Sequence, residues 1–177
     1  MALIKLDLAG KSEIAVEMVC LGNICRSPMA AAVLHNKVMK IQAPRIVVSS
    51  SGTSDYHVGE GAHKLSIATW QVEGYSYDHT ARQFSRRSFE DQDLILCMDL
   101  TNRAMVLNAA PNESTKSKVF LLRQFDPELS QIDPTSREAS ELVVPDPWGE
   151  GMDSFANVLA MIERATDGLL SRLVINK

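Results

Sequence analysis

The sequence has few cysteines. Its 177 residues contain three, Cys20, Cys25 and Cys97, an odd number that is too small for a disulfide framework in a chain of this length. The four histidines are scattered, and no second cysteine pair accompanies Cys20 and Cys25, so the ligand spacing of a structural zinc site is missing. We therefore expect reduced thiols, no metal and no cofactor.

The sequence also lacks long apolar runs and an excess of positive charge. Residues 1–13 are mixed in polarity, without the apolar centre and cleavage site of a signal peptide, and no later run is long enough to span a bilayer. The formal net charge is -4, so no overall basic field attracts nucleic-acid phosphates. These absences predict a cytoplasmic protein that binds neither membranes nor nucleic acid.

The composition is that of an ordinary globular chain. Hydrophobic residues make up 45% and charged residues 23%, unlike the highly charged composition of a disordered chain. A chain of 177 residues fits one domain, because hydrophobic cores of this size close before chains divide in two. We expect one α/β domain.

Short apolar runs alternate with helical patterns along the chain. Strand patterns occur at residues 14–19, 46–50, 94–98 and 118–122, and helical patterns at residues 29–39, 61–72, 101–108 and 153–173. We expect Ser27 to cap the first helix and Asp153 or Ser154 to cap the last. Residues 124–146 carry prolines and many polar residues, which predicts a loop. The alternation predicts parallel crossovers and therefore a doubly wound sheet.

The most informative segment is VCLGNICRSP, residues 19–28, in which five residues separate Cys20 from Arg26. A loop that runs from the end of a buried strand into the start of a helix points backbone N–H groups inward, and the helix dipole strengthens the resulting anion site. The pattern therefore predicts a phosphate-binding loop. Its other predicted substrate-binding residues are Leu21, Gly22, Asn23, Ile24, Cys25 and Ser27.

Cys20 and Arg26 are the predicted reactive pair of this loop. The positive field of such a loop favours the nucleophilic thiolate of Cys20, and the planar guanidinium of Arg26 can bind two phosphate oxygens at once. Ser27 can give its hydroxyl to the helix end or to the Cys20 sulfur. Singly, a buried cysteine and a solvated arginine are common, but together with the loop residues they favour catalysis.

Asp146 is the predicted general acid. When a thiolate takes a phosphoryl group, the departing alkoxide or phenoxide needs a proton. In the segment VVPDPW, prolines on both sides of Asp146 stiffen the backbone and could present its carboxyl group over the loop, with Trp148 as an aromatic wall. On its own, the segment is typical of an Asp-Pro turn. Beside the phosphate loop, it favours the acid role.

These motifs resemble those of the low-molecular-weight protein-tyrosine phosphatases. VCLGNICRSP is similar to the signature of that family, and Asp146-Pro147-Trp148 to its Asp-Pro-aromatic triplet. The segments SSSGTSDYHVG, HTARQ and LILCMD match in the same order. The resemblance covers residues 14–177 and leaves residues 1–13 as an N-terminal extension. It implies a flavodoxin-like domain with a four-stranded parallel sheet and helices on both faces.

The resemblance also implies an activity and a set of supporting residues. The activity is hydrolysis of phosphotyrosine and aryl phosphates through a phosphocysteine. The partners are phosphotyrosine-containing proteins, inorganic phosphate is the product, and the enzyme is a monomer or weak dimer. Asn23, Ser27, Ser50 and His79 would form a hydrogen-bond network that holds the loop. Asp99 matches a family aspartate near the site, although a helix N-cap explains it equally well.

The walls of the cleft and the departures from the family pattern bear on specificity. Tyr56 and Trp148 would form aromatic walls that suit a phenyl phosphate, although each is also consistent with ordinary packing. Ala31 stands where many relatives have glutamate, Tyr56 where many have tryptophan, and residues 149–151 read Gly-Glu-Gly after Trp148. These departures leave the substrate preference open.

Three other functions compete with this interpretation. An arsenate reductase needs a downstream pair of resolving cysteines, but only Cys97 follows the loop. A protein-arginine phosphatase of the same family has threonine at the position of Ile24. A phosphopeptide-binding module without activity would not need the reactive residues. Within the loop, Cys25 could form a disulfide with oxidised Cys20 or pack as a small hydrophobe.

Overall fold

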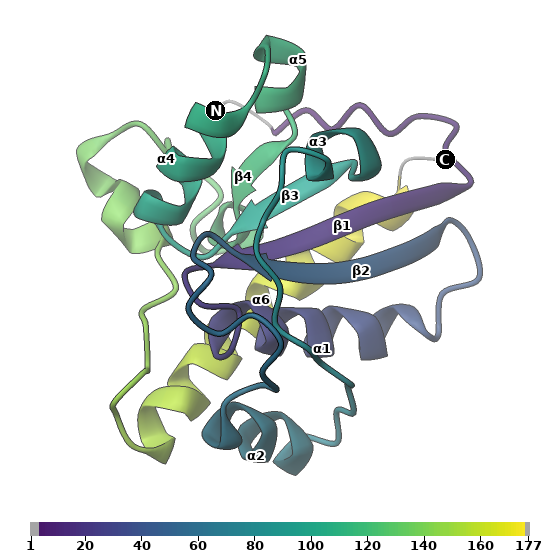
Figure 1. Ribbon diagram of the computed structural model, residues 1–177. Helices are drawn as coiled ribbons and strands as arrows, with labels where there is room; N and C mark the ends of the chain where they lie inside the picture. The colour runs from purple at the N-terminus through teal and green to yellow at the C-terminus, as the bar shows by residue number, and fades with distance from the viewer. Residues whose placement is uncertain (1–3, 176–177) are drawn as a thin grey trace.

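A parallel sheet of four strands forms the centre of the computed structural model, which describes residues 4–175 (Figure 1). The strands, in the spatial order β2-β1-β3-β4, are β1 (Glu13–Cys20), β2 (Arg45–Gly52), β3 (Leu94–Cys97) and β4 (Val119–Leu121). Each strand overlaps an apolar run that predicts a strand. The predicted doubly wound α/β fold with a four-stranded parallel sheet is confirmed.

Strand β1 lies in the middle of the sheet because its side chains are apolar on both faces. Val16 and Met18 are buried in one core cluster, and Val19 is buried in the cluster on the opposite face. The strand pairs with β2 up to the partners Cys20 and Gly52. Since the carboxyl ends of parallel strands meet at one edge, this edge is where such sheets bind ligands.

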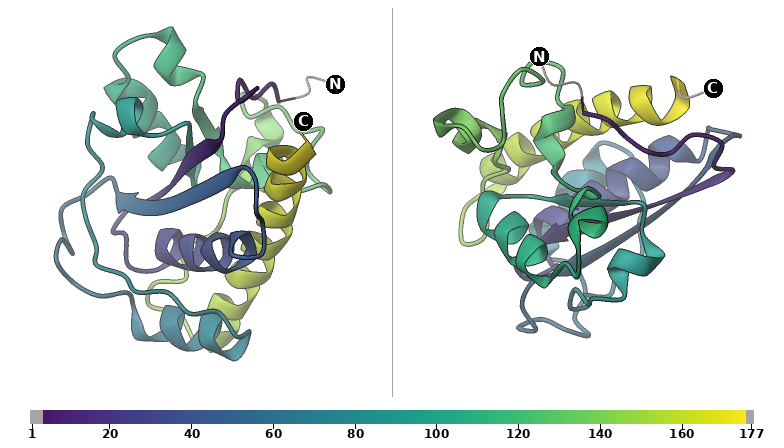
Figure 2. Two further views of the ribbon diagram at one scale, coloured as in Figure 1. Left: turned by 90° about the vertical axis from the view of Figure 1, so that its right-hand side faces the viewer. Right: turned by 90° about the horizontal axis from the view of Figure 1, so that it is seen from above.

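Helices cover both faces of the sheet (Figures 1 and 2). The face of Val16 and Met18 packs on α1 (Arg26–Val38) and α6 (Met152–Ile175), and α2 (Lys64–Val72) packs against these two helices. The opposite face is covered by side chains that include Val106 and Leu142. The remaining elements are α3 (Ser88–Asp91), α4 (Leu100–Ala109), α5 (Glu113–Lys116) and the 3-10 helices η1 (Leu122–Phe125) and η2 (Arg137–Leu142). Among the described helices, none is long and apolar enough to cross a lipid bilayer.

The first helix begins earlier than its sequence pattern predicts. Helix α1 starts at Arg26 with Cys25 as the N-cap residue, and no side chain caps it. The prediction that Ser27 caps this helix is therefore wrong. The hydroxyl of Ser27 instead contacts the Cys20 sulfur at 3.0 Å and accepts a hydrogen bond from Asn23 at 2.8 Å.

Other predicted boundaries also need correction. Helix α2 starts at Lys64, three residues later than the pattern suggests, because the ring of His63 caps it by accepting a hydrogen bond from the Leu65 N–H at 3.2 Å. Helix α6 starts before Asp153 and Ser154, so neither residue occupies the predicted cap position. Residues 124–146 are not a plain loop, because they include the end of η1 and all of η2.

The segment before β1 packs against the body of the domain. Of the predicted extension, residues 1–3 lie outside the described part of the chain, while Leu8 is 5% exposed and belongs to the core beneath the sheet. The guanidinium of Arg172 in α6 donates a hydrogen bond to the carbonyl oxygen of Ile4 at 3.4 Å. These contacts connect the start of the described chain to its last helix.

A close backbone approach joins α6 to η1. A Cβ atom added at Gly168 would lie 1.8 Å from the carbonyl oxygen of Phe125. No side chain fits there unless the two elements move apart, so glycine at this position lets η1 lie directly on α6. This contact holds the end of η1 against α6.

Candidate active site

The loop between β1 and α1 curls around the sulfur of Cys20. The backbone N–H of Asn23 donates a hydrogen bond to this sulfur at 3.3 Å, and the Ser27 hydroxyl lies 3.0 Å from it. Asn23 is fully buried and has a φ of 56°, in the left-handed region that asparagine tolerates better than most residues. The turn at Asn23 places the loop directly over the end of β1.

Asn23 is held by hydrogen bonds to its side chain and its carbonyl oxygen. Its amide nitrogen donates to the hydroxyls of Ser27 and Ser50, at 2.8 and 2.9 Å. Its side-chain oxygen accepts from the backbone N–H of Arg82 at 2.9 Å, and its carbonyl accepts from His79 Nε2 at 2.6 Å. The structure thus brings together the four residues that the family resemblance places in one network. Burial lowers the pKa of His79 although the contact with Asn23 opposes this shift, which favours the neutral ring.

The end of β2 supports the loop from below. A Cβ atom at Gly52 would lie 2.6 Å from the carbonyl oxygen of Leu21 and 3.0 Å from the nitrogen of Asn23. The backbone N–H of Thr53 donates to the carbonyl of Cys20 at 2.9 Å. Glycine at position 52 therefore allows the loop to rest on the edge of the sheet.

Arg26 is buried, with 3% of its surface exposed, and faces two carboxylates. Its Nη1 donates to Asp99 at 2.7 Å and to the carbonyl of Val144 at 3.0 Å, and its Nη2 lies 3.3 Å from Asp146. Burial opposes the charge, but the Cys20 sulfur and the two aspartates outweigh it and raise the pKa of the guanidinium. Arg26 therefore stays charged and its fork points into the site.

Asp99 has both of the roles that the sequence suggests for it, a helix N-cap and an aspartate near the site. One carboxylate oxygen accepts a hydrogen bond from the Asn102 N–H at 2.7 Å and caps α4. The other pairs with Arg26 at 2.7 Å. The N-cap of α4 and the orientation of the guanidinium thus depend on one side chain.

Asp146 lies in the segment between Val144 and α6, with 44% of its side chain exposed. One oxygen faces Arg26, and the other accepts a hydrogen bond from the Trp148 N–H at 3.2 Å. The Asp-Pro turn suggested by the sequence is therefore present, and it leaves the carboxyl group at the mouth of the site.

Cys20, Arg26 and Asp146 line one cavity of about 210 Å³. The predicted substrate-binding residues Asn23 and Ser27 are fully buried and are not among its lining residues. Tyr56 and Trp148 stand at its rim with 73% and 64% of their surfaces exposed, so ordinary half-buried packing does not explain them. His57, which sequence reasoning did not single out, also lines the cavity and pairs with Glu60 at 3.0 Å. The full lining is Cys20, Leu21, Gly22, Ile24, Cys25, Arg26, Tyr56, His57, Asp146 and Trp148.

The other two cysteines are buried and, like Cys20, free. Burial, assisted by the negative charges of Asp146 and Cys20, raises the pKa of Cys25 to about 12. Burial also raises the pKa of Cys97, which is 0% exposed within β3. Unlike Cys25, Cys97 does not line the cavity, so it is not placed to act as a resolving thiol for Cys20. Within residues 4–175, no three histidine, cysteine or acidic side chains cluster in a way that could hold a metal ion.

Comparisons of the sequence and of the fold with known proteins identify relatives of this chain. A family model described as low molecular weight phosphotyrosine protein phosphatase matches residues 15–177. The low molecular weight protein-tyrosine-phosphatase of Streptomyces coelicolor is 40% identical over 154 residues, which cover 86% of this chain and 89% of that protein. The crystal structure of a protein tyrosine phosphatase from Entamoeba histolytica superposes with a TM-score of 0.79 at 31% identity, covering 90% of this chain and 96% of that one. An arginine phosphatase from Geobacillus stearothermophilus gives a TM-score of 0.75 at 27% identity, with 90% and 92% covered.

Proposed function

Because the chain belongs to the low molecular weight phosphotyrosine protein phosphatase family and is a protein-tyrosine phosphatase, we propose that Cys20 is its nucleophile, Arg26 its phosphate clamp and Asp146 its general acid. One observation carries this assignment: the three side chains line the same cavity at the carboxyl end of β1. The start of α1 faces the same place, so a phosphate dianion bound there gains the field of the helix.

In the first step the Cys20 thiolate attacks phosphorus and the bond to the phenolic oxygen breaks. Arg26 and the backbone N–H groups of the loop hold the three remaining phosphate oxygens, on which negative charge is spread in the transition state. Asp146 gives its proton to the departing phenolate. The products of this step are the free tyrosine hydroxyl and a phosphocysteine.

In the second step water attacks the phosphocysteine and inorganic phosphate leaves. The Asp146 carboxylate takes a proton from the attacking water, and the bond between sulfur and phosphorus breaks. Hydrogen bonds from the Ser27 hydroxyl and the Asn23 N–H stabilise the returning thiolate of Cys20. No cofactor takes part in either step. Because the thiolate must stay reduced, the proposed location is the cytoplasm. The proposed oligomeric state is a monomer or weak dimer.

The shape and lining of the cavity support phosphotyrosine as the substrate. The exposed rings of Tyr56 and Trp148 offer aromatic surfaces to the phenyl ring of phosphotyrosine, and phosphoserine has no ring to contact them. Ile24 lines the same cavity with an apolar side chain. It cannot form the polar contact that threonine offers in the arginine phosphatases of the family.

The nucleophile is tested by Cys20→Ser, which should abolish aryl-phosphate hydrolysis while phosphate binding persists, because serine has a similar size but no populated anion at neutral pH. Cys97→Ser is the matched control and should retain most of the activity, since Cys97 does not line the cavity. Turnover at the wild-type rate by Cys20→Ser would contradict the covalent mechanism.

The general acid is tested by Asp146→Asn. Turnover of substrates with poor leaving groups should fall by about 10²–10⁴-fold, the usual contribution of acid–base catalysis. Activated phenols leave without a proton, so a plot of log kcat/KM against the pKa of the leaving phenol should steepen. An unchanged slope would remove Asp146 from this role.

The substrate class is tested by Ile24→Thr with peptides that carry phosphotyrosine, phosphoserine or phosphoarginine. The wild-type enzyme should prefer phosphotyrosine, and the variant should gain phosphoarginine activity because a hydroxyl replaces an apolar group beside the phosphate. A wild-type preference for phosphoarginine would refute the phosphotyrosine assignment.

A further inference from the structure

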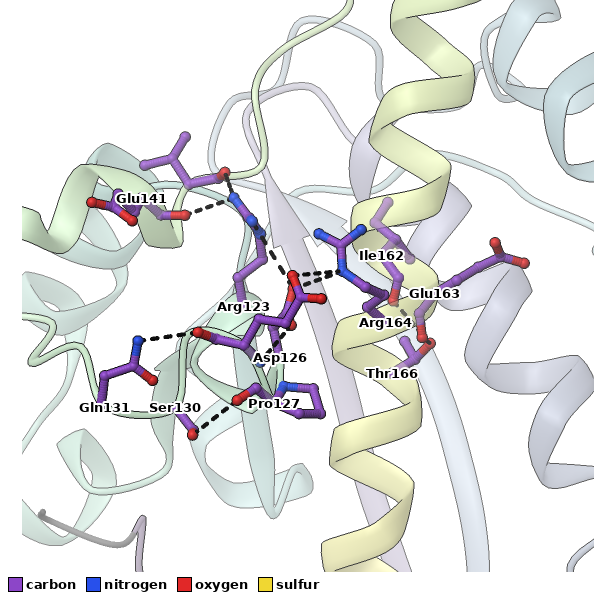
Figure 3. A network of polar contacts seen from close by, with 12 residues as sticks. Arg123, Asp126, Pro127, Ser130, Gln131, Glu141, Ile162, Glu163, Arg164 and Thr166 are labelled. Atoms are coloured by element: carbon purple, nitrogen blue, oxygen red, sulfur yellow. Dashed lines mark hydrogen bonds and ion pairs between the residues drawn. The ribbon is translucent and has the colours of Figure 1, made fainter.

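A buried polar network lies where η1, η2 and α6 meet, outside the cavity (Figure 3). At its centre is Asp126, which is 0% exposed. One of its carboxylate oxygens lies 3.3 Å from Arg164 Nε and 4.0 Å from Arg123 Nη2, and the other accepts a hydrogen bond from the Glu128 N–H at 3.1 Å. Figure 3 shows the two arginines on either side of Asp126. The buried carboxylate therefore attracts a cation from each side, with the shorter contact to Arg164.

The Nη1 of Arg123 contacts backbone carbonyl groups, while its buried Nε has no hydrogen-bond partner within residues 4–175. Its Nη1 donates to the carbonyl oxygens of Glu141 and Val143, at 2.6 and 2.9 Å. These carbonyls lie at the end of η2, where helical hydrogen bonding stops and carbonyl groups need other donors. The Arg123 side chain is only 11% exposed, so water has little access to replace it. Arg123 therefore ties the end of η2 to Asp126.

The backbone held by Arg123 leads directly to the proposed general acid. Val143 is followed by Val144, whose N–H donates to the carbonyl of Met98 at 2.8 Å and whose carbonyl accepts from Arg26 at 3.0 Å. Asp146 follows after a single proline, which allows little freedom in between. The position of the carboxyl group is thus set by three anchors just before it, one on Val143 and two on Val144.

We propose that Arg123, oriented by Asp126, is a positioning residue that sets the reach of Asp146 toward the leaving oxygen of the substrate. This inference rests on the proposed acid role of Asp146. Arg123 does not line the cavity and does not touch the substrate. It acts because proton transfer depends steeply on distance, and a misplacement of about 1 Å can cost about 10²-fold in rate.

The test compares Arg123→Met with Arg164→Met. Each variant removes one cation from Asp126, but only Arg123 contacts the segment before Asp146. With Arg123→Met, kcat/KM for aryl phosphates with poor leaving groups should fall by roughly 10–100-fold, and the plot against leaving-group pKa should steepen. With Arg164→Met, the slope should stay that of the wild type, even if the urea midpoint falls.

Two further variants keep the result interpretable. Arg123→Lys keeps a positive charge beside Asp126 but cannot span both carbonyls, so its slope should lie between those of the wild type and Arg123→Met. It also serves as the test if Arg123→Met fails to fold. The double variant Arg123→Met with Asp146→Asn should show no steeper slope than Asp146→Asn alone, because the acid is already absent.

The possible failures are distinguishable. If Asp146→Asn leaves the slope unchanged, the proposed acid role fails and the inference fails with it. If Asp146→Asn steepens the slope while the Arg123 variants match Arg164→Met, the acid role stands and the positioning role of Arg123 is refuted.

Discussion

Breaking the ion pair between Glu17 and Arg82 from the Arg82 side should cost more stability than breaking an exposed pair such as that of Arg87 with Asp91. Glu17 lies in β1 with 0% of its side chain exposed, and one of its oxygens accepts a hydrogen bond from Arg82 Nη2 at 2.6 Å. Its second oxygen is buried and has no hydrogen-bond partner within residues 4–175. The carboxylate therefore depends on one cation, and removing that cation strands a charge inside the sheet.

The magnitude follows from the burial of the two partners. Breaking a fully buried ion pair from one side costs about 3–5 kcal/mol. The side chain of Arg82 is 44% exposed, so water already screens part of the pair and can partly replace the lost cation. We therefore expect Arg82→Met to lower the free energy of unfolding by about 2–3 kcal/mol, a large part of a total that is typically about 5–15 kcal/mol. The double variant Glu17→Leu with Arg82→Met removes both charges and should recover to within about 1 kcal/mol of the wild type.

Urea unfolding at neutral pH measures these differences, with Arg87→Met as the control. The pair of Arg87 with Asp91 is exposed on both sides, at 80% and 52%, so its loss should cost under about 0.5 kcal/mol. The folded fraction of Arg82→Met should keep its turnover, because the backbone N–H of Arg82, not its side chain, donates to Asn23. A double variant as unstable as Arg82→Met would refute the reasoning, because the stranded charge could not then be the cause.

Three further predictions concern packing, pH and oxidation. Gly168→Ala should lower stability by about 1–3 kcal/mol in thermal unfolding, because its Cβ would lie 1.8 Å from the Phe125 carbonyl oxygen and force α6 from η1. Burial lowers the pKa of His79, so the unfolded chain binds the proton more readily than the folded protein. The contribution of His79 to stability is therefore fully present above about pH 6.5 and is lost as the pH falls toward its folded-state pKa. His79→Gln should flatten the dependence of the urea midpoint on pH over this window. Mild peroxide should inactivate the enzyme through a disulfide between Cys20 and Cys25, visible by mass spectrometry and reversed by dithiothreitol. Cys25→Ser should recover poorly, and equal recovery would leave Cys25 as packing.

The sheet and the loop could be predicted from the sequence because local patterns encode them. Continuous apolar runs indicate strands that are buried on both faces, and β1 fits this description from Val16 to Val19 except at Glu17. The spacing between Cys20 and Arg26 places both ends of one loop at one site. Asp146 lies 120 residues beyond Arg26, so the spacing of the loop cannot indicate it. It is predicted instead from the need for an acid and from its Asp-Pro segment, and the family resemblance agrees.

The contacts that support the site could not be predicted in the same way, because they join distant segments. The partner of Glu17 lies 65 residues away, and Arg123 contacts carbonyl groups 18 and 20 residues away. Only Glu17 carries a signal in the sequence, since a charged residue within a run predicted to be buried requires a partner. Arg123 carries none, because an arginine before a polar stretch is typical of a solvated surface.

The error at the start of α1 has a functional cause. Ser27 followed by proline is a good N-cap sequence, and a cap side chain would have satisfied N–H groups at the helix end. The structure instead commits the Ser27 hydroxyl to Cys20 and Asn23 and leaves the start of α1 without a side-chain cap or an acidic residue in its first turn. A serine or carboxylate cap would occupy the donors and reduce the positive field that an incoming phosphate needs. The position where helix propensity gives the wrong boundary is therefore the position at which we propose that the anion binds.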